Sequence, residues 1–189
     1  MSALAFNAFR PQIQQVMAED PTDLTRIFND DVNLVSWQRN ADNAIAEYCR
    51  TLALTMPIKR IVHVDSIQTD IGHALPDAQG KEAFLHDIAL LCHMFSCLMD
   101  CQQLGLRLET LRQPMCPKFH TDHLVCRLVC TYLGPGTEWL DANANTLKAA
   151  PFAVTLLKGS GWEGNEQHAI VHRSPAGEAP RVLLTLDPM

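Results

Sequence analysis

Three metal-capable side chains stand within five residues in the segment FHTDH, which runs from Phe119 to His123. On an extended chain, side chains two positions apart point to the same face, so His120 and Asp122 can hold one ion from the same side. His123 then faces the other way. A third ligand has to come from elsewhere, and His172 in the apolar segment AIVHRSP is the best candidate. We therefore predict a metal site made by His120, Asp122 and His172.

Two histidines and one carboxylate on one face form the donor set of non-haem Fe(II) oxygenases, which leaves coordination positions open. Arg181 begins the last apolar segment, RVLLTLD, nine residues after His172. We expect the two segments to form a short hairpin that places Arg181 deep inside a barrel. A guanidinium there suits bidentate capture of a co-substrate carboxylate. The alternative is a strand-edge charge that pairs with Asp187 or Glu178.

Several further residues are candidates for supporting roles around this site. Cys116 or His123 could lie behind the ligands, or could close a four-ligand zinc site, because a thiolate favours zinc over an oxygenase iron. Trp162 and Asn165 stand in the glycine-rich segment GSGWEGN and could line a substrate mouth, since loops on rigid barrels often carry function. Trp162 could equally plug the barrel end.

The elements that must position these residues change in character at Gly105. Helical spacing before it predicts helices at 40–56 and 81–104, with Gly105 ending the second. The other segments predicted there are strands at 31–39 and 58–66 and a loop at 68–80. After Gly105 the pattern is that of short strands, predicted at 106–112, 119–134, 137–141, 152–159, 168–175 and 181–187, with a loop at 142–151. Helices followed by many short strands favour an α+β protein with an antiparallel barrel or jelly roll.

Length and composition restrict the class of protein. The 189 residues fit one domain, with a mixed, helix-rich part at 1–105 and a β-barrel, metal-binding part at 106–189. The net charge is −6 without a lysine or arginine cluster, so we expect no nucleic-acid partner. The longest apolar run, Ile88 to Met99, is interrupted and too short for a membrane span, and the N-terminus lacks a secretory signal pattern. We therefore expect a cytoplasmic protein that has no membrane partner.

The pattern His-x-Asp, a distal histidine in a strand and a following arginine resembles the 2-oxoglutarate/Fe(II)-dependent dioxygenases, over roughly 106–187. The resemblance implies a cupin-like double-stranded β-helix (jelly-roll) core with the N-terminal helices packed on it. It also implies Fe(II) as cofactor and 2-oxoglutarate as co-substrate, with the distal carboxylate of the latter on Arg181. Many members place a serine or threonine two residues after the arginine, where this chain has Leu183. Tyr132 or Thr185 could replace that hydroxyl.

A closer resemblance covers nearly the whole chain. The segments PMCPKFHTDHLVCRLVCTYLGPGTEWL, LLKGSGWEGN and VHRSP resemble an uncharacterised bacterial domain-of-unknown-function family, number 1826. Members are often encoded near zinc-responsive metallochaperone GTPases, so the resemblance implies a possible GTPase partner and raises the case for Zn(II).

These observations leave more than one function open. The first is a mononuclear Fe(II)/2-oxoglutarate oxygenase that acts on an unknown small molecule or protein. The second is a non-catalytic zinc-binding barrel for storage, sensing or delivery. The third is a metal-dependent hydrolase whose general base would be Glu138 or Glu163.

Overall fold

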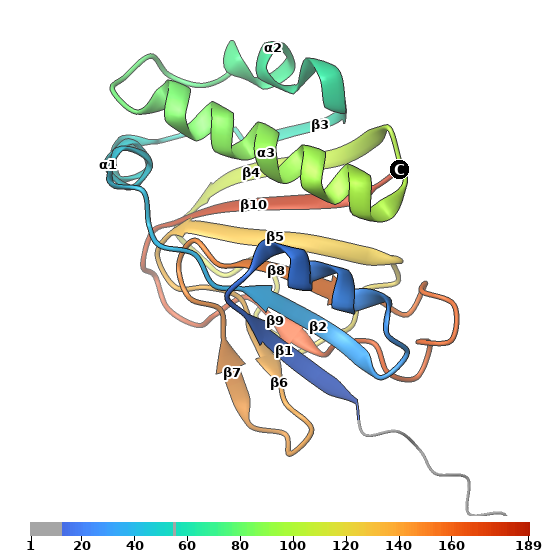
Figure 1. Ribbon diagram of the computed structural model, residues 1–189. Coiled ribbons are helices and arrows are strands. Elements are labelled where there is room, and N and C mark those ends of the chain that lie inside the picture. The colour runs from blue at the N-terminus through green and yellow to red at the C-terminus, as the bar shows by residue number, and fades with distance from the viewer. Residues whose placement is uncertain (1–12, 55) are drawn as a thin grey trace, which may run out of the picture.

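Two facing β-sheets and a layer of helices make up the protein, as the computed structural model shows for residues 13–54 and 56–189 (Figure 1). The larger sheet has the strand order β1-β2-β8-β5-β10-β4-β3. Its strands are β1 (Gln14–Ala18), β2 (Val32–Trp37), β8 (Val154–Lys158), β5 (Cys126–Leu133), β10 (Arg181–Pro188), β4 (Gln103–Leu111) and β3 (Ile58–His63). The smaller sheet contains β7 (Thr146–Lys148), β6 (Glu138–Leu140) and β9 (His172–Arg173), in the order β7-β6-β9.

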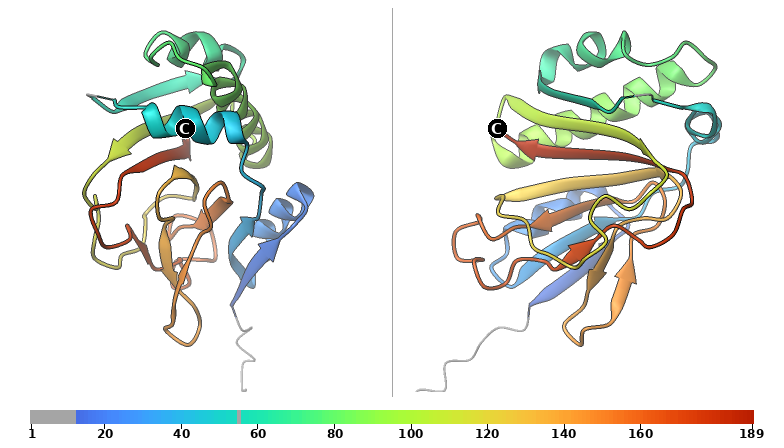
Figure 2. Two further views of the ribbon diagram at one scale, coloured as in Figure 1. Left: turned by 90° about the vertical axis from the view of Figure 1, so that its left-hand side faces the viewer. Right: turned by 180° about the vertical axis from the view of Figure 1, so that it is seen from behind.

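The helices lie on the face of the larger sheet that is turned away from the smaller one (Figure 2). They are α1 (Asn43–Thr51), α2 (Ile67–Gly72) and α3 (Lys81–Met99), with two 3-10 helices, η1 (Pro21–Phe28) and η2 (Val64–Ser66). Asp42 caps α1 by accepting hydrogen bonds from the backbone N–H groups of Ala44 and Ile45. These elements confirm the predicted α+β class.

Two apolar cores result from the alternation of side chains along the strands. The main core lies between the larger sheet and the helices, with side chains such as Phe84, Ile88 and Phe95 of α3 fully buried. A smaller core lies between the two sheets and is formed by Leu34, Val129, Trp139, Ala149, Leu157 and Ile170. The smaller core supports the segments that carry the candidate metal ligands.

By length and composition alone, α3 could cross a membrane. We expected only the shorter run from Ile88 to Met99 to be apolar, and the helix is longer than that run. Its buried residues pack against the sheet, which is the pattern of a core helix in a globular protein.

Several predicted boundaries are wrong for local reasons. α3 ends at Met99 and not at 104, because Asp100 takes a left-handed conformation (φ 48°) and β4 starts at Gln103. The predicted loop at 68–80 contains most of α2, and the loop at 142–151 contains β7. The sequence analysis assigned no element to β1, which pairs in parallel with β2. The larger sheet takes strands from both the 1–105 and the 106–189 parts.

Candidate metal centre

His120 and His172 are direct neighbours across a strand edge. The backbone N–H of His120 donates to the carbonyl of His172 at 3.0 Å, and the N–H of His172 donates to the carbonyl of His120 at 2.9 Å. Their ring centroids lie 4.6 Å apart. The FHTDH segment therefore extends the smaller sheet beside β9, and residues distant in the chain meet as the sequence predicts.

Both imidazoles present the same nitrogen to Asp122. Nδ1 of His120 lies 3.0 Å from the carbonyl of Lys118, and Nδ1 of His172 lies 3.2 Å from that of Ile170. An Nδ1–H that donates to a carbonyl leaves Nε2 with a free lone pair, which is the usual arrangement for a metal-binding histidine. The Nε2 atoms lie 3.7 and 3.5 Å from the two carboxylate oxygens of Asp122.

The three donor atoms lie within 4.8 Å of one another. Burial lowers the pKa of His172, although the nearby Asp122 carboxylate opposes that shift. A histidine with a lowered pKa is neutral at physiological pH, and the neutral form is the one that binds metal. In the described part of the chain, this is the one group of three donors with metal-binding geometry.

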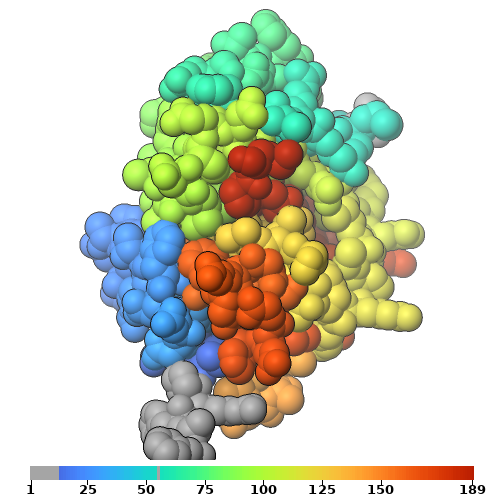
Figure 3. Space-filling view, turned by 90° about the vertical axis from the view of Figure 1, so that its right-hand side faces the viewer, coloured from blue at the N-terminus to red at the C-terminus, as the bar shows by residue number. Residues whose placement is uncertain are grey.

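Arg127 on β5 holds the Asp122 carboxylate in place. Its Nη1 donates to Oδ2 of Asp122 at 2.7 Å, while Nε and Nη2 donate to the two oxygens of Asp187 at 2.7 and 2.8 Å. Asp187 stands near the end of β10, which reaches the surface in the view of Figure 3. The sequence analysis missed this pair, because it depends on the register between β5 and β10.

A cavity of about 60 Å³ lies beside the three residues. It is lined by Arg107, Met115, Cys116, His120, Arg127, Val129, Thr137, His172, Arg173, Ser174, Leu183 and Thr185. The lining is contributed by β4, β5, β9 and β10 and by the segment before His120, so it is the space between the two sheets.

Arg181 is buried between the sheets, 4% exposed. Its Nη2 donates to the Thr131 hydroxyl at 3.4 Å, while Nε and Nη1 have no partner among the described residues. Burial lowers its pKa to about 10, against the opposing charge of Glu138, so the guanidinium stays charged at neutral pH. The predicted alternative of a pair with Asp187 is wrong, because Asp187 binds Arg127.

The predicted hairpin between the segments of His172 and Arg181 is also wrong. β9 belongs to the smaller sheet and β10 to the larger one, so residues 174–180 cross between the sheets. Arg181 still faces the interior, because it alternates with Val182, which packs in the main core.

A comparison with known protein families shows which family the chain belongs to. Residues 18–187 match the family described as protein of unknown function (DUF1826). The chain belongs to this family. A comparison with curated protein sequences finds no match.

Two solved structures have a fold similar to that of this DUF1826 chain. A dioxygenase for auxin oxidation from rice superposes with a TM-score of 0.53 and 12% identity, covering 94% of this chain and 83% of that one. A putative oxygenase from Shewanella oneidensis gives 0.51 and 10%, with coverages of 94% and 89%. The likeness concerns the fold, and it confirms the predicted double-stranded β-helix core.

In this DUF1826 chain, Tyr132 does not lie near the cavity, contrary to our expectation. It points into the main core, where its hydroxyl donates to Oδ2 of Asp87 on α3 at 2.6 Å. Thr185 does line the cavity, but the hydroxyl that contacts Arg181 belongs to Thr131. Alternation along β5 explains the error, because Tyr132 and Thr131 point to opposite faces of the sheet.

Trp162 and Asn165 have packing and hydrogen-bond partners within the protein, and neither lines the cavity beside the ligands. Trp162 packs against Phe28, with ring centroids 5.6 Å apart, and Asn165 is buried and donates to the carbonyl of Gly159 at 3.0 Å. A Cβ atom on Gly159 would lie 2.0 Å from the carbonyl oxygen of Leu124, so this glycine permits a close approach to the segment after Asp122. The loop therefore fixes the FHTDH segment from behind.

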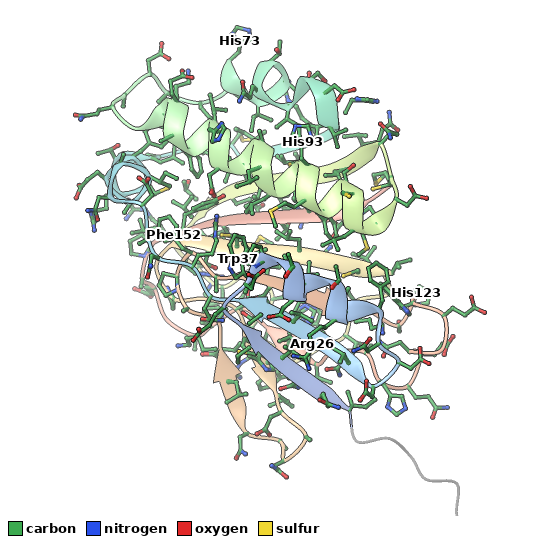
Figure 4. All side chains as sticks on the ribbon, viewed as in Figure 1. Arg26, Trp37, His73, His93, His123 and Phe152 are labelled. Carbon is green, nitrogen blue, oxygen red and sulfur yellow. The ribbon has the colours of Figure 1, made fainter. Side chains whose placement is uncertain are left out.

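The remaining candidates occupy the edge of the site. The Nδ1 of His123 lies 2.9 Å from the Ser160 hydroxyl, and its exposed side chain lies at the right-hand side of the molecule in Figure 4. Cys116 lines the cavity but is not part of the three-donor group. Glu138 is paired with Arg173 and Lys148, and Glu163 is exposed, so neither is placed as a general base at the cavity.

Proposed function

We propose that the protein is a mononuclear non-haem Fe(II) oxygenase that uses 2-oxoglutarate as co-substrate. One observation carries the proposal: Arg181 is buried with two unpartnered donor nitrogens, on the face of β10 whose next residues, Leu183 and Thr185, line the cavity beside the ligand group. A buried cation without an acceptor is costly unless a ligand supplies one. A dicarboxylate bound beside a metal ion would meet that requirement.

The donor set fits the metal. His120, Asp122 and His172 would hold Fe(II) through two Nε2 atoms and one carboxylate oxygen, and the set leaves other coordination positions open. Arg181 and the Thr131 hydroxyl would pair with the distal carboxylate of 2-oxoglutarate. Bound iron and 2-oxoglutarate together supply the oxidation of a substrate C–H bond by O₂, with succinate and CO₂ as the other products.

The chain's own residues orient and shield that site. Arg127, itself held by Asp187, fixes the Asp122 carboxylate by donating to Oδ2, while Oδ1 faces His120. The carbonyls of Lys118 and Ile170 fix the two imidazole rings. The small core contains Trp139, which is opposite His172 in the smaller sheet, and His172 is buried.

Anaerobic spectroscopy tests this proposal directly. Fe(II) and 2-oxoglutarate added together should give a weak visible charge-transfer band, because both chelating groups of the co-substrate bind the metal. The band should require far more 2-oxoglutarate in Arg181→Ala and should be unchanged in the control Arg26→Ala, which alters an exposed arginine on η1. Absence of the band in the native protein, or an identical titration for Arg181→Ala, contradicts the proposal.

Metal analysis addresses the zinc-module alternative. A closed zinc site would need a fourth donor from Cys116 or His123, and neither joins the group of three in the described residues. Protein purified without chelators should therefore release its metal readily to a chelator and then bind Fe(II). Tightly held zinc that resists exchange, together with no charge-transfer band, would favour a storage or delivery role.

A further inference from the structure

Arg107 on β4 lies at the rim of the cavity, half-buried, at the level of the candidate metal ligands. In the antiparallel register it is directly opposite Thr185, which is in turn opposite Val129. Residues directly opposite each other share one face of the sheet, so all three side chains point into the space between the sheets. Arg107 is therefore within the site and separate from Arg181, because Leu183 stands between Arg181 and Thr185 on the same face of β10.

The other two arginines that line the cavity are neutralised by carboxylates. Arg127 binds Asp122 and Asp187. Arg173 donates to Glu138 at 2.9 Å, and its guanidinium lies 4.2 Å above the ring centre of Phe119. Both of these side chains therefore hold parts of the protein together, which is a structural use of arginine.

Arg107 has no such partner. Within residues 13–54 and 56–189, no carboxylate oxygen lies within 4.0 Å of its guanidinium and no side-chain hydrogen bond forms to it. The residue opposite Arg107 on β3 is Lys59, whose charge is balanced by Glu109 at 3.5 Å. Glu109 is also the nearest acidic residue along β4, and it pairs with Lys59 and not with Arg107.

Arg107 is therefore an uncompensated cation beside the cavity, in a chain of net charge −6. A guanidinium presents a planar fork of donors that matches the oxygens of a carboxylate or phosphate. Local positive charge inside a cavity also raises the concentration of anions there. We propose that Arg107 binds an oxyanion, a carboxylate or a phosphate, on the molecule that is oxidised, so that the primary substrate is anionic. That the bound molecule is oxidised rests on the proposed function, whereas the anion site itself can be tested independently of it.

The test is a calorimetric titration of Zn(II)-loaded protein carrying Arg181→Ala, in which the deep guanidinium no longer competes for anions. The probes are inorganic phosphate, benzoate and, as the neutral match to benzoate, benzamide. We expect saturable binding of phosphate or benzoate and none of benzamide, and the stronger of the two anions identifies the oxyanion. Adding Arg107→Gln should weaken that binding by about tenfold or more, because a charge-assisted bond is lost.

Two results would overturn the inference: no saturable anion binding, or equal binding with and without Arg107→Gln, as expected if the anion touches only the metal. Arg107→Lys keeps the charge and loses the fork, so it should retain part of the binding. In the otherwise native protein, Arg107→Gln should leave the Fe(II)/2-oxoglutarate band intact. Loss of the band in native protein contradicts the oxygenase proposal and leaves the anion titration interpretable.

Discussion

Each face of the larger sheet buries the side chain of one arginine, and the two arginines differ in how many hydrogen-bond acceptors surround them. On the helix side, Arg39 donates from Nη1 and Nη2 to the Asp87 carboxylate at 2.7 and 3.1 Å, and its Nε donates to the carbonyl of Phe152 at 2.9 Å. Between the sheets, Arg181 has only a long contact to Thr131. A buried guanidinium whose N–H donors all have acceptors stabilises the fold. A buried guanidinium with unpartnered N–H donors is suited to binding a ligand that supplies the acceptors.

The same contrast runs along β10. Val182, Leu184 and Leu186 are buried in the main core. The alternate residues face the space between the sheets, and apart from Leu183 they are polar or charged: Arg181, Thr185 and Asp187. One strand therefore contributes apolar contacts to stability on one side and reactive or ligand-binding groups on the other, and substitutions on the two sides should have separable effects.

The largest effect is expected on the helix side. Asp87→Ala leaves Arg39 buried without its carboxylate and removes the acceptor of the Tyr132 hydroxyl. Removing one partner of a buried ion pair costs about 3–5 kcal/mol, so urea denaturation should show a loss of that order. The Zn(II) affinity of the folded variant should stay unchanged. A stability equal to that of the native protein would show that the Arg39 pair is not a structural feature.

The second effect is confined to the site. His172→Ala removes a metal ligand and should weaken Zn(II) or Co(II) binding by about 100-fold or more, beyond the 10–100-fold that loss of an outer partner costs. Calorimetry measures the affinity, and urea denaturation without metal checks the fold. The matched control is His123→Ala, whose imidazole contacts Ser160, and it should bind metal normally. If both variants lose metal equally, the proposed ligand set is wrong.

Local alternation accounts for part of the site that the sequence could predict. His120 and Asp122 face one site because they are two apart, an inference that needs only a locally extended chain. Arg181 is buried as expected, although the hairpin from which we inferred this does not form. His172 required a long-range guess, which the backbone pairing of His120 and His172 bears out in position. The family and the double-stranded β-helix core were predicted from motifs in the same segments.

Contacts that depend on strand register could not be predicted. The pairing of Arg127 with Asp187 and the proximity of Thr131 to Arg181 follow from how β5 aligns with β10. The hairpin error has the same origin, since consecutive apolar segments pair or separate according to the whole barrel. The partners of Trp162 and Asn165 could not be predicted either, because they depend on how the glycine-rich loop packs on Phe28 and on the segment after Asp122.

A third, smaller effect is expected from the Arg127–Asp187 ion pair, which positions the Asp122 carboxylate. Arg127→Gln and Asp187→Asn each disturb the hydrogen bonding of Asp122, and each should weaken Co(II) binding by about 10–100-fold. Asp187→Asn removes one of the two carboxylates that pair with Arg127, so Arg127 keeps a positive charge near the metal that Asp187 no longer balances. The double variant has no charge at either position 127 or position 187. We therefore expect the double variant to lose less affinity than the two single effects added together, and strict additivity would show that the two residues act separately.

The smallest expected effect is a gain in stability. Arg181→Met replaces a buried charge with unpartnered donors by an apolar side chain of similar length, so the ligand-free protein should become more stable by about 1–2 kcal/mol in urea. Addition of Fe(II) and 2-oxoglutarate under anaerobic conditions should then stabilise the native protein and leave Arg181→Met almost unaffected. The control Arg39→Met, on the other face, should lose stability, because it leaves Asp87 unpaired. If Arg181→Met also destabilises the protein, Arg181 serves the fold as Arg39 does, and the difference between the two faces disappears.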